Sequence, residues 1–132
     1  MSIQTLTQDN FDQIITENPL VLVDFWSHWC GPCRIFSEIY QEAAKRHPEA
    51  IFGQVNIEEE PELAKDFNVR SIPFLMVFRK DVAVYAEPGA LTLPALEDII
   101  QRAKALDISE IRKSIDQLES THINQGGSET ED

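Results

Sequence analysis

The feature that most constrains this chain is an apolar strand followed at once by two cysteines and a helix. Residues 20–26 form a continuous apolar run, interrupted only by Asp24, which is typical of a strand buried on both faces. The sequence Trp-Cys-Gly-Pro-Cys follows at residues 29–33, and Pro32 suits the first turn of a helix because it has no N–H to leave unpaired. A Cys-x-x-Cys pair in this context predicts a dithiol that cycles to a disulfide and passes two electrons to another protein's disulfide.

Cys30 and Cys33 are the only cysteines among the 132 residues, so no other thiol can form a structural bridge. We expect the Cys30 sulfur to point outward at the start of the helix, where unpaired N–H groups and the helix dipole stabilise a thiolate. Cys30 would then attack a substrate disulfide, and Cys33, one turn further, would resolve the mixed disulfide. The alternative is a zinc site. A structural zinc ion needs four ligands, and beyond the pair the chain has only the scattered His28, His47 and His122, so we expect no metal.

The remaining apolar patterns predict alternating helices and strands. A first helix is expected at residues 7–15, with Thr7 or Asp9 as its cap. The expected elements after the first strand are a helix from Pro32 to about His47, a strand at 51–57, a short helix at 58–67, strands at 74–78 and 82–86, and a helix from 92 to about 105. This order predicts an α/β fold with a central mixed β-sheet flanked by helices.

Length and charge limit the possible functions. With 132 residues, 42% of them apolar and 26% charged, the chain reads as one soluble globular domain. Its formal net charge of −12 disfavours nucleic acid or a membrane surface as a partner, because both attract basic patches. We identify neither a targeting signal nor an apolar run long enough to span a membrane. With only two cysteines, a reducing, cytoplasmic location is expected.

The sequence changes character after residue 106. Asp107 begins a segment that resembles a capping box. An apolar seam follows at Ile108, Ile111, Ile115 and Leu118. We therefore expect a domain at residues 1–106, an amphipathic helical extension at 107–120 and an acidic disordered tail at 121–132. The seam is expected to pack on the chain's own domain, away from the cysteine pair, and the chain to be a monomer.

These motifs resemble the thioredoxin family. The similarity covers about residues 3–105 and includes the Trp-Cys-Gly-Pro-Cys sequence, Val-Asp-Phe-Trp at 23–26, Val-Arg-Ser-Ile-Pro at 69–73 and the Gly-Ala pair at 89–90. The resemblance implies the thioredoxin fold, a cis peptide bond before Pro73 and a thioredoxin reductase as the protein that recharges the disulfide. It also implies a substrate-binding rim around Cys30, formed by Trp29, Gly31, Pro32, Ile72, Pro73, Gly89 and Ala90.

Asp24 is the one polar residue in the apolar strand. Burial of a carboxylate costs free energy and raises the pKa of the acid. The resemblance places Asp24 behind Cys33, where it would take the proton of that thiol, through water, as Cys33 attacks. The alternative is an aspartate at a strand end that caps a neighbouring helix.

Four residues depart from the family pattern. Gln54 stands where many thioredoxins have a lysine, and Phe74 replaces a small threonine after the cis-proline. Glu38 stands where many members have a helix-kinking proline, and His28 lies between the two tryptophans. From the sequence, we expect none of these residues to alter the dithiol chemistry. They affect the pKa values and the partners to be expected.

The leading functional hypothesis is a protein-disulfide reductase for cell redox homeostasis. It needs no bound cofactor, because Cys30 and Cys33 form the redox-active disulfide. Electrons are expected from NADPH through a thioredoxin reductase, for transfer to disulfide-containing protein substrates. An oxidase or isomerase is disfavoured, since it normally needs an oxidising compartment. The alternative from another class is a thioredoxin-fold chaperone or binding module that acts through its surface and C-terminal extension.

Overall fold

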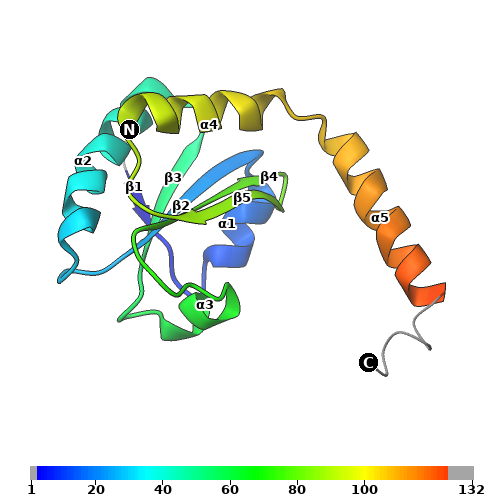
Figure 1. Ribbon diagram of the computed structural model, residues 1–132, viewed down its shortest axis with the longest axis horizontal. Helices are drawn as coiled ribbons and strands as arrows, with labels where there is room; N and C mark the ends of the chain where they lie inside the picture. Colours follow the sequence, from blue (N-terminus) through cyan, green and yellow to red (C-terminus); the bar gives the residue numbers. More distant parts are fainter. Residues whose placement is uncertain (1–2, 125–132) are drawn as a thin grey trace.

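The structure is a computed structural model that describes residues 3–124. Five strands form one sheet between layers of helices, and the last helix extends away from this body (Figure 1). The elements in chain order are β1 (Ile3–Thr5), α1 (Phe11–Glu17), β2 (Leu20–Trp26), α2 (Gly31–Arg46), β3 (Ile51–Asn56), α3 (Pro61–Asp66), β4 (Phe74–Arg79), β5 (Val82–Pro88), α4 (Leu93–Ala105) and α5 (Ile108–Asn124). The predicted α/β fold, with a mixed sheet and a C-terminal helix, is confirmed.

The sheet has the strand order β1-β3-β2-β4-β5. β1 and β2 run parallel to β3, whereas β4 runs antiparallel to both β2 and β5. β2 therefore lies at the centre, and its register pairs Asp24 with Gln54 of β3 on one side and with Leu75 of β4 on the other. The cysteines follow the carboxyl end of β2, the edge of an open α/β sheet where ligands usually bind.

Both faces of β2 are covered. Leu20 and Leu22 belong to the apolar core that includes residues of α2 and α4. Val21, Val23 and Phe25 belong to a second core, on the other face, that includes residues of α1 and α3. The continuous apolar run is thus used on both sides, which confirms the prediction of a central buried strand.

The first helix begins later than the sequence indicated. α1 starts at Phe11, and its N-cap residue, Asn10, makes no side-chain capping hydrogen bond. Instead, the Phe11 N–H donates to the Thr7 carbonyl (3.0 Å), and the Thr7 N–H donates to Asn10 Oδ1 (2.7 Å). The predicted cap at Thr7 or Asp9 is wrong, because residues 7–10 form a hydrogen-bonded turn before the helix.

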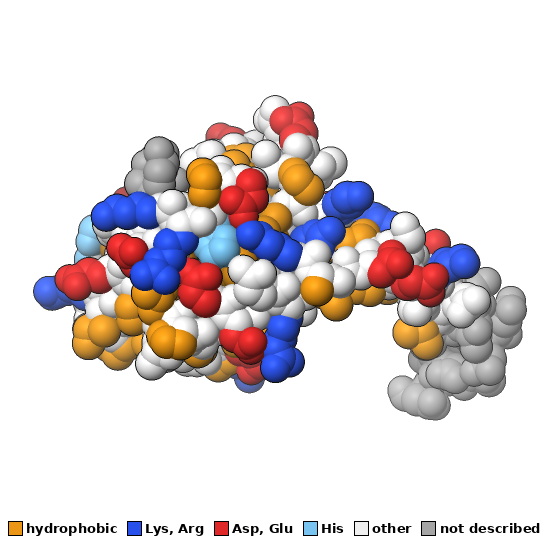
Figure 2. Space-filling view, turned by 90° about the horizontal axis from the view of Figure 1, so that it is seen from above, with side chains coloured by type: hydrophobic (Ala, Val, Ile, Leu, Met, Phe, Trp, Pro, Cys, Tyr) orange, Lys and Arg blue, Asp and Glu red, His pale blue; other side chains and the backbone are white. Residues whose placement is uncertain are grey.

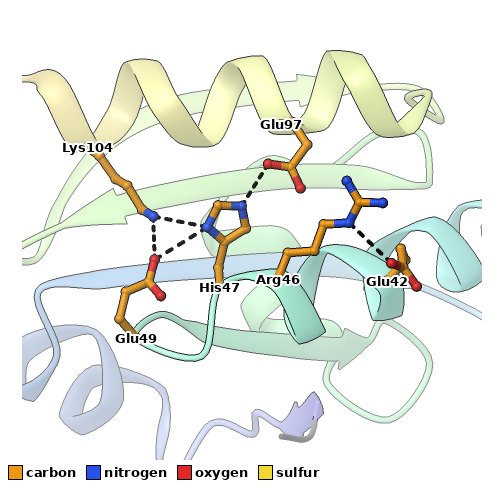
Figure 3. A network of polar contacts seen from close by, with 6 residues as sticks. All are labelled: Glu42, Arg46, His47, Glu49, Glu97 and Lys104. Atoms are coloured by element: carbon orange, nitrogen blue, oxygen red, sulfur yellow. Dashed lines mark hydrogen bonds and ion pairs between the residues drawn. The ribbon is translucent and has the colours of Figure 1, made fainter.

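A polar network joins the C-terminal end of α2 to α4 (Figure 3). His47, which follows α2, is 6% exposed, and its Nε2 lies 2.8 Å from Glu97 Oε1 on α4. The His47 Nδ1 lies 3.0 Å from Lys104 Nζ and 3.3 Å from Glu49 Oε2. Lys104 also pairs with Glu49, and the hydrogen bond from Lys104 lowers the pKa of that carboxyl to about 2. These contacts give a buried imidazole the partners it needs and hold α4 against α2.

α5 is attached to the body at its N-terminal end. Ile108 is buried, and Asp107 Oδ1 accepts the Glu110 N–H at 3.3 Å, as expected for a cap. Arg112 contacts the turn between β4 and β5, where its guanidinium lies 2.7 Å from the Asp81 carboxylate. The first turns of the extension therefore pack on the domain.

The rest of α5 projects from the body. Ile115 is 37% exposed and Leu118 is 70% exposed. Figures 1 and 2 show the helix as an arm that extends beyond the sheet, with hydrophobic side chains exposed along it. The expectation that the whole seam packs on the domain is wrong at its far end: Ile115 still lines a hollow with residues 81–83, whereas Leu118 is largely exposed to solvent. α5 continues to Asn124, past the expected end at residue 120, and the rest of the expected tail, 125–132, lies outside the described residues.

Paired alanine substitutions test how far the seam is packed. Loss of a buried isoleucine side chain costs about 2–5 kcal/mol, so Ile108→Ala should lower the free energy of unfolding by at least about 2 kcal/mol. Leu118→Ala should change it by less than about 0.5 kcal/mol, because the side chain is exposed. Equilibrium unfolding in urea measures both values. Equal losses in the free energy of unfolding for the two variants would contradict this expectation and show that the domain covers the seam along its length.

Candidate active site

The cysteine pair lies where β2 gives way to α2. Cys30 is the N-cap of α2, the helix begins at Gly31, and Pro32 lies in its first turn. Cys30 and Cys33 form a disulfide, with an S–S distance of 2.17 Å and a Cα–Cα distance of 5.2 Å. The Cys33 N–H donates to Cys30 Sγ at 3.1 Å. An N–H group at the start of a long helix thus faces the Cys30 sulfur, and it would stabilise a thiolate there after reduction.

Cys30 is more buried than expected. Cys30 is 4% exposed and Cys33 is 2% exposed, so the predicted outward-pointing Cys30 sulfur is not found in the disulfide form. The carbonyl oxygen of Ile72 lies 3.8 Å from Cys30 Sγ and helps to cover it. A group that approaches Cys30 must therefore come alongside the backbone of Ile72.

Two loops meet beside the disulfide. The peptide bond between Ile72 and Pro73 is cis, as the resemblance implied. The Gly89 N–H donates to the Pro73 carbonyl at 2.8 Å. Gly89 has φ +113°, a conformation that favours glycine because side chains are strained there. Gly89 and Ala90 are exposed, so the loops bring these four expected rim residues close to one another.

Trp29 is held at the surface by a contact that sequence analysis missed. The indole is 67% exposed, and its Nε1–H donates to Glu58 Oε2 at 3.0 Å. Glu58 follows β3, 29 residues away, and a glutamate in an exposed loop gives no local signal of such a contact. Trp26 is only partly buried, and its ring packs edge-to-face on His28, with centroids 4.6 Å apart.

The structure also places the two remaining rim residues and two of the residues that depart from the family pattern. Gly31 and Pro32 are exposed on the first turn of α2. Glu38 is exposed further along the same helix. Phe74 is partly buried, and its ring packs edge-to-face on Phe25 with centroids 6.0 Å apart, so it is a core residue as much as a rim residue.

Asp24 is fully buried on the central strand. Burial raises its pKa from 3.8 to about 7, and the hydrogen bond from Gln54 opposes this rise. Gln54 Nε2 donates to Asp24 Oδ2 at 3.3 Å, whereas Oδ1 has no hydrogen-bond partner among the described residues. The side chain caps no helix. An acid with this pKa both accepts and releases a proton near neutral pH.

A small cleft lies next to the inner cysteine. Its volume is 110 Å³, and it is lined by Trp26, Cys33, Arg34, Ser37 and Gln54. A larger hollow of 350 Å³ lies between β5 and α4 and contains neither cysteine nor Asp24. The small cleft is the one relevant to thiol chemistry, because it is lined both by Cys33 and by Gln54, the hydrogen-bond partner of Asp24.

Residues 3–124 contain no cluster of three or more His, Cys, Asp or Glu side chains placed to hold a metal ion. Over the same residues, none of the helices combines the length and the apolar character that crossing a membrane requires.

Comparisons with known proteins agree on one family. The family model described as Thioredoxin matches residues 2–102. "Putative thioredoxin 2" of Streptomyces coelicolor is 51% identical over 110 residues, which cover 83% of this chain and 82% of that protein. A solved thioredoxin from Plasmodium falciparum is 34% identical with a TM-score of 0.70, and the match covers 75% of this chain and 97% of that one. A mutant thioredoxin from Halobacterium salinarum NRC-1 gives a TM-score of 0.75 at 27% identity, over 80% of this chain and 94% of that one.

The raised pKa of Asp24 predicts a pH-dependent stability. The folded protein keeps this proton up to about pH 7, whereas the unfolded chain loses it near the ordinary value of 3.8, so stability falls as pH rises between these values. Asp24→Asn removes the effect and should raise the free energy of unfolding by up to roughly 4 kcal/mol above pH 7. Urea unfolding of the oxidised protein at several pH values measures the difference.

Asp12→Asn is the matched control, because Asp12 is exposed on α1. The free energy of unfolding of Asp12→Asn should differ from that of the parent by a constant amount between about pH 5 and pH 8. Over the same range, the difference between Asp24→Asn and the parent should grow. A constant difference for Asp24→Asn as well would contradict the raised pKa.

Proposed function

The chain belongs to the thioredoxin family and is a thioredoxin-type thiol–disulfide oxidoreductase, and from this premise we propose that it works as a protein-disulfide reductase. The observation that supports the proposal most directly is the Cys30–Cys33 disulfide at the N-terminus of α2, with the Ile72 backbone alongside. That arrangement supplies a stabilised thiolate next to a main-chain carbonyl that an extended substrate segment can pair with.

In the proposed reaction, the Cys30 thiolate attacks one sulfur of the substrate disulfide. A mixed disulfide forms, and the other substrate sulfur leaves as a thiolate and takes a proton. Cys33 then loses its proton to Asp24 and attacks Cys30 Sγ, so that the Cys30–Cys33 bond forms and the second substrate sulfur is released. The substrate gains two electrons, and the dithiol is oxidised to the disulfide.

The substrates of this proposal are proteins with accessible disulfides. The indole of Trp29 and the loop at Gly89 and Ala90 are exposed, whereas Ile72 is partly buried and Pro73 is buried, so these residues present a surface beside the disulfide. Gly31 and Pro32 are exposed next to Cys30, and a side-chain atom added at Gly31 would meet nothing within 4 Å. Such a surface suits a polypeptide segment better than a small molecule.

The proposed electron source is NADPH, through a thioredoxin reductase that reduces the Cys30–Cys33 disulfide. The proposed role is redox homeostasis in the cytoplasm, where glutathione and related systems keep thiols reduced. The protein itself binds no cofactor in this scheme, since the dithiol carries the electrons. The net charge of −12 supports protein partners over nucleic acid or an anionic membrane surface.

Serine substitutions of the two cysteines test the roles. Cys30→Ser should abolish the reduction of insulin in the presence of dithiothreitol, because the attacking sulfur is gone. Cys33→Ser should instead accumulate mixed disulfides with substrates, because the first bond forms and cannot be resolved. Limiting iodoacetamide should label Cys30 first in the reduced parent, as read by mass spectrometry. Labelling of Cys33 first would reverse the assignment.

The exposed seam of α5 favours a second candidate, a chaperone or binding module. Leu118 and Ile115 present apolar surface to solvent, and exposed apolar patches often mark interaction sites. In this alternative the extension binds unfolded or partner proteins, and the cysteines are dispensable.

Truncation after Ala105 separates the two candidates. Removal of Ile108 and Arg112 deletes the contacts that attach α5, so the melting temperature should fall modestly. Insulin reduction should stay nearly unchanged, because the disulfide and its surrounding loops are intact. A large loss of activity, or protection of client proteins by the Cys30→Ser full-length chain, would instead favour the binding module.

A further inference from the structure

The two oxygens of the Asp24 carboxyl group are in different situations. Oδ2 accepts the hydrogen bond from Gln54, whereas Oδ1 is buried without a hydrogen-bond partner among the described residues. Gln54 faces Asp24 directly across the paired strands β2 and β3. The same side chain lines the small cleft that Cys33 also lines. Gln54 therefore contacts the acid and borders the space beside the inner thiol.

We propose that Gln54 is a positioning residue for disulfide exchange: its amide holds Oδ2 of Asp24 and leaves Oδ1 as the oxygen that receives the proton of Cys33. The inference rests on the proposed reductase function, in which Cys33 loses a proton as it attacks. The proton leaves Cys33 Sγ and ends on Asp24 Oδ1. The electron pair left on Sγ forms the bond to Cys30, while the bond from Cys30 to the substrate sulfur breaks.

The cleft beside Cys33 is large enough to hold water, and Gln54, which lines it, connects it to the Asp24 carboxyl group. Its volume is 110 Å³, whereas one buried water needs about 10–15 Å³ and two to four polar partners. The hydroxyl of Ser37, the amide of Gln54 and the guanidinium of Arg34 supply such partners at its walls. Ser37 is partly buried and Arg34 is exposed, so the same cleft gives the proton a way to solvent.

The electrostatic surroundings of Asp24 explain why the Gln54 amide matters. Tyr40 on α2 is buried, and burial together with the Asp24 charge raises its pKa well above the ordinary value, so it stays neutral. On β4 the residue opposite is the apolar Leu75, and the nearest cleft cation, Arg34, is exposed. Within the described part of the chain, Gln54 is thus the one hydrogen-bond donor on this carboxyl group. A neutral donor stabilises the carboxylate less than a cation does.

Two substitutions at position 54 test the proposal in opposite directions. Gln54→Leu removes the donor with little change of volume and should raise the midpoint of Asp24 titration above about 7. Gln54→Lys introduces a cationic donor and should lower it. Carbon-13 NMR of the Asp24 carboxyl carbon in the oxidised protein reads the midpoint without any need for activity. Gln13→Leu, at an exposed glutamine that bonds Glu17 on α1, should leave it unchanged.

The same variants should also differ in the rate at which they reduce a peptide disulfide in a single turnover, measured between about pH 6 and pH 9. Near pH 6.5, Gln54→Leu should be about tenfold slower than the parent, because less Asp24 is ionised and its orientation is lost. The difference should narrow toward pH 9, where Asp24 is ionised in both proteins, and leave only the part due to the lost orientation. Gln54→Lys should shift the pH–rate midpoint downward, and Gln13→Leu should follow the parent.

An Asp24 midpoint that stays unchanged in both Gln54 variants would overturn the proposal. Shifted midpoints with an unshifted pH–rate profile would also overturn it, because Gln54 would then affect the acid without affecting the reaction. A parent protein that reduces no disulfide, while the NMR midpoints shift as expected, would instead refute the proposed function and, with it, the part of Gln54 in exchange. The two failures are therefore distinguishable.

Discussion

The geometry of the active site depends on the burial of β2 on both faces. Two apolar cores enclose this strand, and hydrogen-bonded neighbours hold it on both edges. The ladder continues past its end, since the Ile57 N–H donates to the Trp26 carbonyl at 3.0 Å. The chain that leaves β2 is thereby fixed in direction, and Cys30 arrives at the N-terminus of α2 next to the loop that carries Ile72. Small displacements of this strand would separate the sulfur from both.

The burial of β2 on both faces also makes the ionised form of Asp24 unfavourable in free energy. A carboxyl group in a buried strand opposes folding when it is ionised, and Gln54 compensates for only part of that cost. Proteins tend to break such local rules at functional sites, where the strained group has a use. In the proposed reaction, the use is a proton acceptor whose pKa is close to physiological pH. Stability and exchange chemistry thus place opposite demands on one residue, and the chain keeps the acid.

The features that the sequence predicted are those encoded in local patterns. The buried strand, the helix that starts after Cys30 and the mixed sheet follow from apolar runs and from residues such as Pro32, which act over a few neighbours. The contact of Trp29 with Glu58 and the contacts of His47 with Glu97 and Lys104 join residues that are 29 to 57 positions apart. No local pattern encodes such pairs, because they form only once the elements are packed. The outward course of α5 was missed for a similar reason: an apolar seam indicates that a helix needs cover, without indicating where the cover lies.

The attachment of α5 also limits what the extension can do to the chemistry. Pro73 directly precedes β4, whereas Asp81, the residue that binds Arg112, directly precedes β5 at the far end of the β4–β5 turn. These two points are separated by the six residues of β4, a distance of about 20 Å for an extended strand. The family match ends within α4, so the complete redox centre is formed without α5. α5 begins at the end of β4 that lies away from the disulfide, and it extends away from the body (Figure 1), so any influence of its described residues on disulfide exchange passes along β4 and β5 or through a bound partner.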